Sequence, residues 1–135
     1  MSVTRIIGLG VEDRGDDAAG LLVARLLGAV VPAWVEVHEC AGDAGAPPDL
    51  LEGAGRIVMV DAARGGEPGV VERLPLGAAR PARVRGARGP GNLLADARLY
   101  VVYGHRFEPG PVTPAVAAGV WTAAELILRH ELSTP

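Results

Sequence analysis

Carboxylates close to the start of the chain are the residues best suited to chemistry, and they are Glu12, Asp13, Asp16 and Asp17. Such a cluster repels phosphate and attracts metal ions or protons. A fifth carboxylate, Asp61, directly follows the apolar residues 57–60. If both segments reach the same edge of one sheet, two or three carboxylates converge there. They could then bind a divalent cation or share a proton.

Each of these carboxylates also has a purely structural interpretation. Asp61 could simply start the turn over residues 62–66. Asp16 or Asp17 could cap the following helix, because short acidic side chains accept hydrogen bonds from amides at a helix start and favour the helix dipole. Glu12 and Asp13 could be solvated loop residues. Two adjacent side chains diverge on a helix, so Asp16 and Asp17 are not both expected to reach one ion.

His105 is the best histidine candidate for the same edge, because it follows the expected strand over residues 99–103. His38 is expected in the core or at a sheet edge. His130 is expected on the surface near the end of the last helix, where a cation favours the dipole. Cys40 has no CxxC partner and is expected to be a buried packing residue. His105 is therefore the one histidine expected at the site.

The opening turn has the first half of a dinucleotide-binding loop, with Gly8 and Gly10, but Asp13 stands where that motif has its third glycine. In a dinucleotide site the pyrophosphate lies on bare backbone amides at a helix N-terminus. Here it would meet a crowd of carboxylates. The sequence therefore disfavours a nucleotide site.

Strands and helices alternate along the chain. Apolar runs predict strands over residues 3–9, 34–39, 56–60, 69–74 and 99–103. Helices are predicted from Asp16 or Asp17 to about Leu27, with Gly28 as the stop, briefly over residues 49–52, and after the threonine cap and proline at Thr113 and Pro114.

This alternation predicts an α/β fold, a three-layer helix–sheet–helix sandwich with a mostly parallel sheet of about five strands. The strand over residues 56–60 is continuously apolar, as in the middle of a parallel sheet. The strand over residues 69–74 is expected nearer an edge. A chain of 135 residues is expected to form one domain, residues 1–135.

Composition excludes several functional classes. The net charge of -3 provides no general attraction to nucleic acid or to an anionic membrane. No apolar stretch reaches the roughly 18 residues that span a bilayer, and the start does not resemble a signal peptide. One cysteine excludes an internal disulfide. We therefore expect a cytoplasmic protein that binds neither nucleic acid nor membrane.

A long connection between the fourth and fifth expected strands is rich in arginine. Between residues 73 and 96 it carries Arg73, Arg80, Arg83, Arg85 and Arg88. It could contact an acidic partner through charge-assisted hydrogen bonds, or be a solvated surface loop. We expect a solvated surface loop, although its length exceeds that of ordinary connections, which is an argument for a lid or a binding role.

Taken together, these residues resemble the hydrogenase maturation proteases, over most of the chain. These endopeptidases remove a C-terminal extension from the large subunit of [NiFe] hydrogenases. Their glycine turn and acidic helix start are matched by Gly8, Gly10, Asp16, Asp17 and Gly20. Their later motifs are matched by Gly42, Asp43, Ala44 and Gly45 with one shift, by Asp61, by Leu94, Ala95 and Asp96, and by residues 112–116.

The resemblance implies an aspartic-type endopeptidase acting on the precursor of a [NiFe] hydrogenase large subunit, with nickel in that substrate as the recognition point. It implies that Asp17 and Asp61 are the catalytic and metal-binding carboxylates. The family's histidine ligand is absent: Pro90 or Gly91 stands in its place, and Val11 replaces the asparagine of the glycine turn. Nickel favours imidazole among its ligands, so His105 is the expected replacement ligand. The alternative is a catalytically degenerate relative that binds a protein without cleaving it.

Overall fold

The structure is a computed structural model and describes residues 3–76 and 97–132. Five strands form one sheet in the order β2-β1-β3-β5-β4. The strands are β1 (Thr4–Gly10), β2 (Val35–Ala41), β3 (Arg56–Ala63), β4 (Val71–Pro75) and β5 (Ala97–Tyr103). The helices are α1 (Ala19–Gly28), α3 (Pro114–His130) and two 3-10 helices, η1 (Gly15–Ala18) and η2 (Pro48–Leu51).

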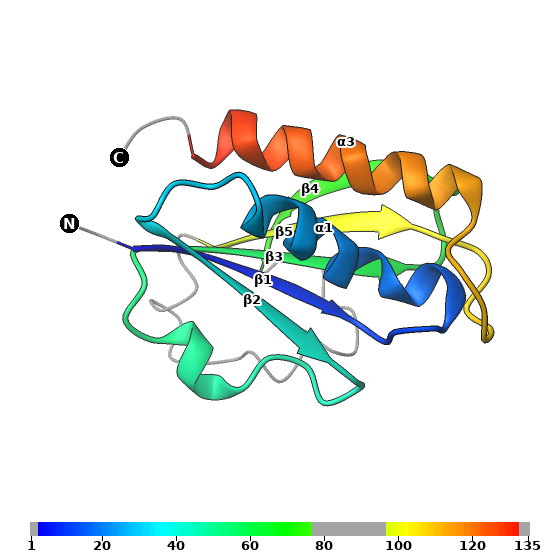
Figure 1. Ribbon diagram of the computed structural model, residues 1–135, viewed down its shortest axis with the longest axis horizontal. Coiled ribbons are helices and arrows are strands. Elements are labelled where there is room, and N and C mark those ends of the chain that lie inside the picture. The colour runs from blue at the N-terminus through cyan, green and yellow to red at the C-terminus, as the bar shows by residue number, and fades with distance from the viewer. Residues whose placement is uncertain (1–2, 77–96, 133–135) are drawn as a thin grey trace.

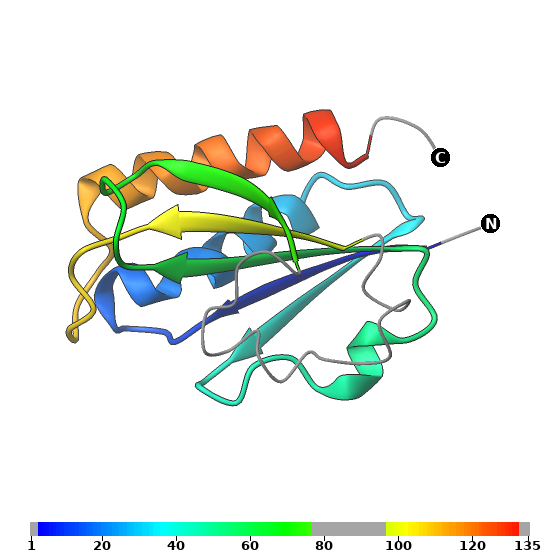
Figure 2. The same ribbon diagram turned by 180° about the vertical axis from the view of Figure 1, so that it is seen from behind.

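The predicted fold class is confirmed. The β1–β2, β1–β3 and β3–β5 pairs are parallel, and only β4 runs antiparallel, at one edge beside β5. α1 and α3 lie together over one face of the sheet. In both views η2 lies below the sheet, near the end at which the parallel strands begin (Figures 1 and 2). The described strands number five, as the sequence predicts.

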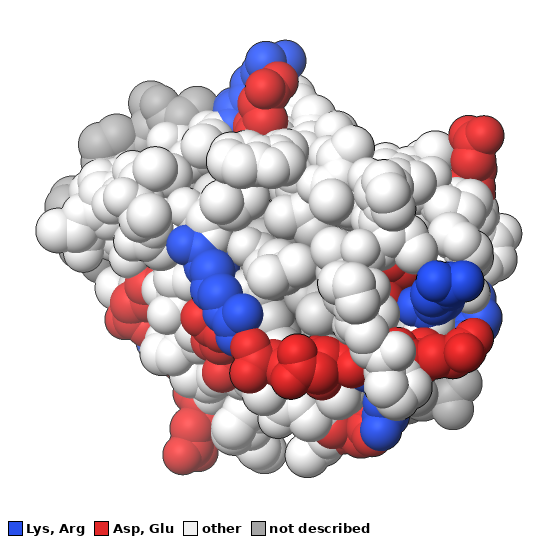
Figure 3. Space-filling view, turned by 45° about the vertical axis from the view of Figure 1, so that its right-hand side comes forward, with Lys and Arg blue, Asp and Glu red and all other residues white. Residues whose placement is uncertain are grey.

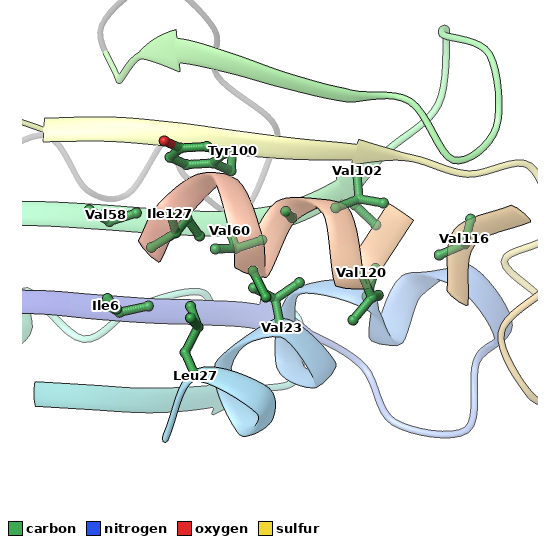
Figure 4. Packing of buried hydrophobic residues seen from close by; sticks show 14 of the residues in the cluster. Ile6, Val23, Leu27, Val58, Val60, Tyr100, Val102, Val116, Val120 and Ile127 are labelled. Atoms are coloured by element: carbon green, nitrogen blue, oxygen red, sulfur yellow. The ribbon is translucent and has the colours of Figure 1, made fainter. Parts of the chain in front are cut away.

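The face under α1 and α3 carries the larger part of the hydrophobic core. Side chains of β1, β3 and β5 point toward both helices, and Val23, Leu27, Val120 and Ile127 pack down between them (Figure 4). Tyr100 is the largest fully buried side chain. Because few aromatic residues are available, branched aliphatic side chains fill most of this layer.

The opposite face has its own apolar layer, in which Leu51 of η2 packs with Met59 and Leu99 of the central strands. The connection from β1 to β2 runs through α1 and that from β2 to β3 runs through η2, so the two cover opposite faces. The chain therefore reverses its winding direction between β1 and β3. In open α/β sheets, a crevice forms at the carboxyl ends of the strands at such a point.

Three local predictions are corrected. β3 continues past Val60 to Ala63, because β5 goes on pairing with it through Asp61↔Val101 to Ala63↔Tyr103. Neither acidic residue caps α1: η1 comes between, so Ala18 is the N-cap without a side-chain hydrogen bond. Gly28 is the last helical residue and not the stop, since Ala29 takes the C-cap position.

Among the described residues, no helix is long and apolar enough to span a membrane.

The C-terminal end of α3 is tied to the sheet by a buried carboxylate. The side chain of Glu131 is fully buried and accepts hydrogen bonds from Arg56 at 2.9 Å, Arg73 at 2.6 Å and Tyr100 at 2.6 Å. Burial by itself raises the pKa of Glu131, but its bonds to Arg73 and Tyr100 outweigh this and hold the pKa below its ordinary value. Burial and the same carboxylate raise the pKa of Tyr100.

Replacing Glu131 by Gln is expected to lower the free energy of unfolding at pH 7 by about 2 kcal/mol, since charge-assisted bonds are lost around a buried site. A carboxylate whose pKa is lowered by folding stabilises the protein above its unfolded pKa, near 4.5, and loses this contribution as the pH falls further. Urea unfolding of E131Q should therefore show a weaker pH dependence than wild type below this pH.

Glu125→Gln is the matched control on the same helix. Glu125 is exposed and pairs only with Arg129 one turn later, so its loss should change stability by less than about 0.5 kcal/mol. Equal effects of the two variants would contradict the anchoring role of Glu131.

Candidate functional site

Asp61 lies where two neighbouring strands separate. The pairing of β1 with β3 ends at Gly8 and Val60, so Asp61 is the first residue of β3 beyond it. Its residue is only 1% exposed, and its Oδ1 accepts a hydrogen bond of 2.8 Å from the amide of Ala62. The structural alternative, in which Asp61 starts a turn, is wrong because β3 continues to Ala63. A buried carboxylate at this fork costs stability and is typical of functional sites.

Asp17 lies in a segment that packs against both strands of this fork. It is 4% exposed and belongs to η1, which contacts both β1 and β3. Its carbonyl oxygen accepts a hydrogen bond of 3.1 Å from the amide of Val11, directly after β1. The opening loop and Asp61 are therefore brought to one edge of the sheet, as the sequence predicts from parallel neighbouring strands. The catalytic role of the two carboxylates stays a prediction.

The two glycines of the opening turn serve packing. A Cβ on Gly8 would lie 2.3 Å from the carbonyl oxygen of Gly20, so glycine is needed for the close approach of β1 and α1. A Cβ on Gly10 would lie 2.5 Å from the carbonyl oxygen of Asp17. The Gly-x-Gly turn thus lets η1 and α1 lie directly over the fork.

Asp16 has a different function from its neighbour. Its side chain is fully buried and accepts four hydrogen bonds, from the amides of His105 and Arg106 at 3.0 Å and from the amide and hydroxyl of Thr113 at 2.8 Å. Burial alone raises the pKa of Asp16, but these bonds outweigh it and lower the pKa below its ordinary value. The hydroxyl of Thr113 therefore donates a hydrogen bond to Asp16 and does not cap α3.

His105 lies at the predicted edge of the sheet, directly after β5. Its side chain is 56% exposed, and its Nδ1 lies 3.6 Å from Oδ2 of Asp16. Residues 3–76 and 97–132 contain no group of three or more His, Cys, Asp or Glu side chains placed to hold a metal ion. Within these residues, Asp17, Asp61 and His105 do not form the expected trio of metal ligands.

The remaining sequence candidates are placed away from this fork or act structurally. His38 pairs with Glu36 on the edge strand β2, and His130 is exposed at the end of α3. Cys40 packs against the second apolar layer, and burial raises its pKa, which makes it a poor nucleophile. Glu12 is exposed and pairs with Arg25.

The arginine-rich connection can be judged only at its first residue. Arg73 belongs to β4 and bonds Glu131, so it is not a loop contact for a partner. Arg80, Arg83, Arg85 and Arg88 lie outside the described residues, as do the family-like Leu94, Ala95 and Asp96 and the positions Pro90 and Gly91.

An apolar groove of about 500 Å³ lies between α1 and α3, on the far side of the helices from the fork. Its lining includes Leu27, Val30 and Trp121, and Trp121 is 66% exposed. Figure 3 shows a broad uncharged area on this side of the molecule with charged side chains at its margins. No carboxylate of the fork lines this groove.

No family model and no curated protein matches the chain. Solved structures do match, over nearly the whole length. The [NiFe] hydrogenase maturation protease HybD from Thermococcus kodakarensis superimposes with a TM-score of 0.76 and 26% identity, covering 94% of this chain and 97% of that one. The chain has the fold of the [NiFe] hydrogenase maturation proteases. The resemblance expected from the sequence is thereby confirmed.

Two further structures with the maturation-protease fold match at lower identity. The protease HycI from Thermococcus kodakarensis KOD1 has a TM-score of 0.73 and 23% identity, covering 95% of this chain and 91% of that one. The endopeptidase HybD from E. coli has a TM-score of 0.72 and 21% identity, covering 94% and 90%. At these identities the likeness concerns the fold.

Sequence reasoning missed what Asp16 does within the maturation-protease fold. Thr113 and Asp16 are 97 positions apart, and both carry plausible local functions as helix caps. Arg64 was also missed: it lies 4.4 Å above the Phe107 ring and donates to the carbonyl oxygen of His105 at 3.2 Å. Gly104 is the residue in the sequence that could have indicated the contact between this loop and Asp16. A Cβ at position 104 would lie 2.6 Å from the Cβ of Asp16.

Proposed function

We propose that this protein is an endopeptidase that removes the C-terminal extension from the precursor of a [NiFe] hydrogenase large subunit. The observation that carries this proposal is the pair of buried carboxylates, Asp17 and Asp61, at the winding-reversal point of a maturation-protease fold. Structures with this fold are themselves named as maturation proteases, HybD among them.

In this proposal, nickel arrives with the precursor and is part of the substrate. Asp17 and Asp61 approach the nickel and help to place the scissile bond or to activate the attacking water, as an aspartic-type peptidase does. Carboxylates alone select nickel poorly against other cations, whereas imidazole is a good nickel ligand. His105 is the exposed imidazole closest in the chain to this edge, and in this proposal it supplies the nitrogen ligand. The expected location is the cytoplasm.

The test is a processing assay with purified precursor, loaded with nickel or free of it. Wild type is expected to shorten only the nickel-loaded precursor, and mass spectrometry should find the released extension. His105→Ala is expected to slow processing at least about tenfold, and nickel calorimetry on the free protein should show whether any site exists without substrate. An intact nickel-loaded precursor after incubation with folded wild type would refute the peptidase.

A second candidate is a relative that binds its protein partner without cleaving it. The observation that favours it is the lack of a three-ligand cluster among the described side chains. In the same assay, this candidate predicts a stable complex with the precursor and no shortened product. Co-elution of the two intact chains on gel filtration would identify it.

A further inference from the structure

The loop over residues 104–113 is attached to the opening loop by backbone hydrogen bonds and by the side chain of Asp16. Each carboxylate oxygen of Asp16 accepts two hydrogen bonds: Oδ2 from the amides of His105 and Arg106, and Oδ1 from the amide and hydroxyl of Thr113. One buried carboxylate thus binds both ends of the loop. Its four acceptor positions are all used by donors from residues about 90 or more positions away in the chain.

Backbone contacts continue the same attachment. The amide of Asp16 donates to the carbonyl oxygen of Arg106 at 2.7 Å, and the amide of Gly15 donates to that of Gly110 at 2.9 Å. A Cβ on Gly104 would lie 2.6 Å from Cβ and 3.0 Å from Oδ2 of Asp16, so the loop approaches too closely for any other residue. The loop is therefore held against η1 at several points, with Asp16 at the centre.

This attachment determines the position of the His105 imidazole. The amide of His105 is bonded to Asp16, and Nδ1 of the ring faces Oδ2 of the same carboxylate at 3.6 Å. Because Nε2 is on the opposite edge of the ring and the side chain is 56% exposed, the outward nitrogen is available to a substrate. A carboxylate behind one ring nitrogen commonly orients the other nitrogen toward a ligand.

We propose that Asp16 is a positioning residue that holds the 104–113 loop and so fixes the position of the His105 imidazole at this edge of the sheet. The effect on catalysis rests on the proposed peptidase function; the effect on the loop does not. Asp16 itself does not contact the substrate in this proposal. It acts through His105, which distinguishes it from the neighbouring Asp17.

Asp16→Asn tests the proposal with almost no change in shape. The amide group retains one acceptor oxygen, but its nitrogen cannot accept, so one pair of donors loses its partner. If Oδ2 is the oxygen replaced, the amides of His105 and Arg106 should exchange with deuterium about tenfold faster or more, as for the loss of charge-assisted hydrogen bonds. If Oδ1 is replaced, the Thr113 amide should show the increase.

A double-mutant cycle with His105→Ala separates positioning from a general structural effect. In the wild-type background, D16N should lower kcat/KM for processing by about tenfold or more. In the H105A background, D16N should lower it by less than about twofold, because the residue through which it acts is gone. Equal factors in both backgrounds would overturn the proposal. Glu108→Gln, an exposed carboxylate change on the same loop, is the control and should leave exchange and processing unchanged.

Two further outcomes have defined meanings. If D16N does not fold, Gly104→Ala displaces the loop from an intact Asp16, and it should reproduce both the exchange increase and the coupling to His105. If folded wild type does not process the precursor, the peptidase function fails, and amide exchange alone decides the positioning role. Unchanged exchange at His105, Arg106 and Thr113 in D16N would refute it.

Discussion

Asp61→Asn is expected to lower the rate of precursor processing by at least about a hundredfold, as for the loss of a general base or of a charge at the reacting centre. Asn keeps the shape of the side chain and can still accept the hydrogen bond from the amide of Ala62. The substitution therefore removes the negative charge and nearly keeps the shape of the side chain. Asp17→Asn should have an effect of the same order, and the processing assay with nickel-loaded precursor measures both.

Melting temperature distinguishes a functional from a structural role for Asp61. Asn nearly keeps the shape of this side chain, which is 1% exposed, so a purely catalytic role predicts a melting temperature close to that of wild type. Asp49→Asn, in η2 away from the fork, should change neither quantity. Normal processing by a folded D61N variant would contradict its assignment as a catalytic residue. A large drop in melting temperature together with lost processing would indicate a structural role.

Gly20→Ala is expected to destabilise the protein by roughly 3 kcal/mol or more, the upper range for overpacking. A Cβ on Gly20 would lie 2.1 Å from the carbonyl oxygen of Leu9 and 2.4 Å from that of Val60. Both atoms belong to the backbone of central strands, so neither can rotate away as a side chain would. α1 must then lift from the fork, and urea unfolding should show the loss directly.

Gly28→Ala is the matched control, because it makes the same change at the other end of the same helix. The nearest atom to its Cβ is Cγ1 of Val37 at 3.9 Å, an ordinary contact. Alanine also restricts the unfolded chain, so the free energy of unfolding should stay the same or rise by about 0.4–1 kcal/mol. A loss in G28A as large as in G20A would contradict contact with the strands as the reason for glycine at position 20.

The strands were predictable because local composition decides them. The continuous apolar run ending at Val60 is typical of a central parallel strand, and β3 is in the middle of the sheet. The predicted edge position of residues 69–74 is confirmed by β4, whose side chains are partly exposed. The boundaries were less predictable: β3 extends through Asp61 because β5 offers partners there, which is a property of the neighbour.

α3 begins directly after Thr113, as predicted, but the side-chain contacts of the expected helix caps were not predictable, for a similar reason. Asp16 has the residue type and position of an N-cap, and Thr113 precedes a proline as a cap does, so local rules assign each to its own helix. In the structure they bond each other, at 2.8 Å from hydroxyl to carboxylate. A buried carboxylate with four donors is more favourable than a solvent-exposed cap, and those donors come from a distant loop.

The sequence by itself determined the alternation of strands and helices, the parallel sheet, and the segments that carry carboxylates to its edge. These follow from periodicity and turn chemistry, which act over a few residues. Only the tertiary structure decided that Asp16 bonds the His105 loop, and that the buried Asp61 belongs to a strand that continues past it. Such assignments depend on which donors and acceptors meet across the fold, and residues far apart in the chain meet only when the strands and helices pack.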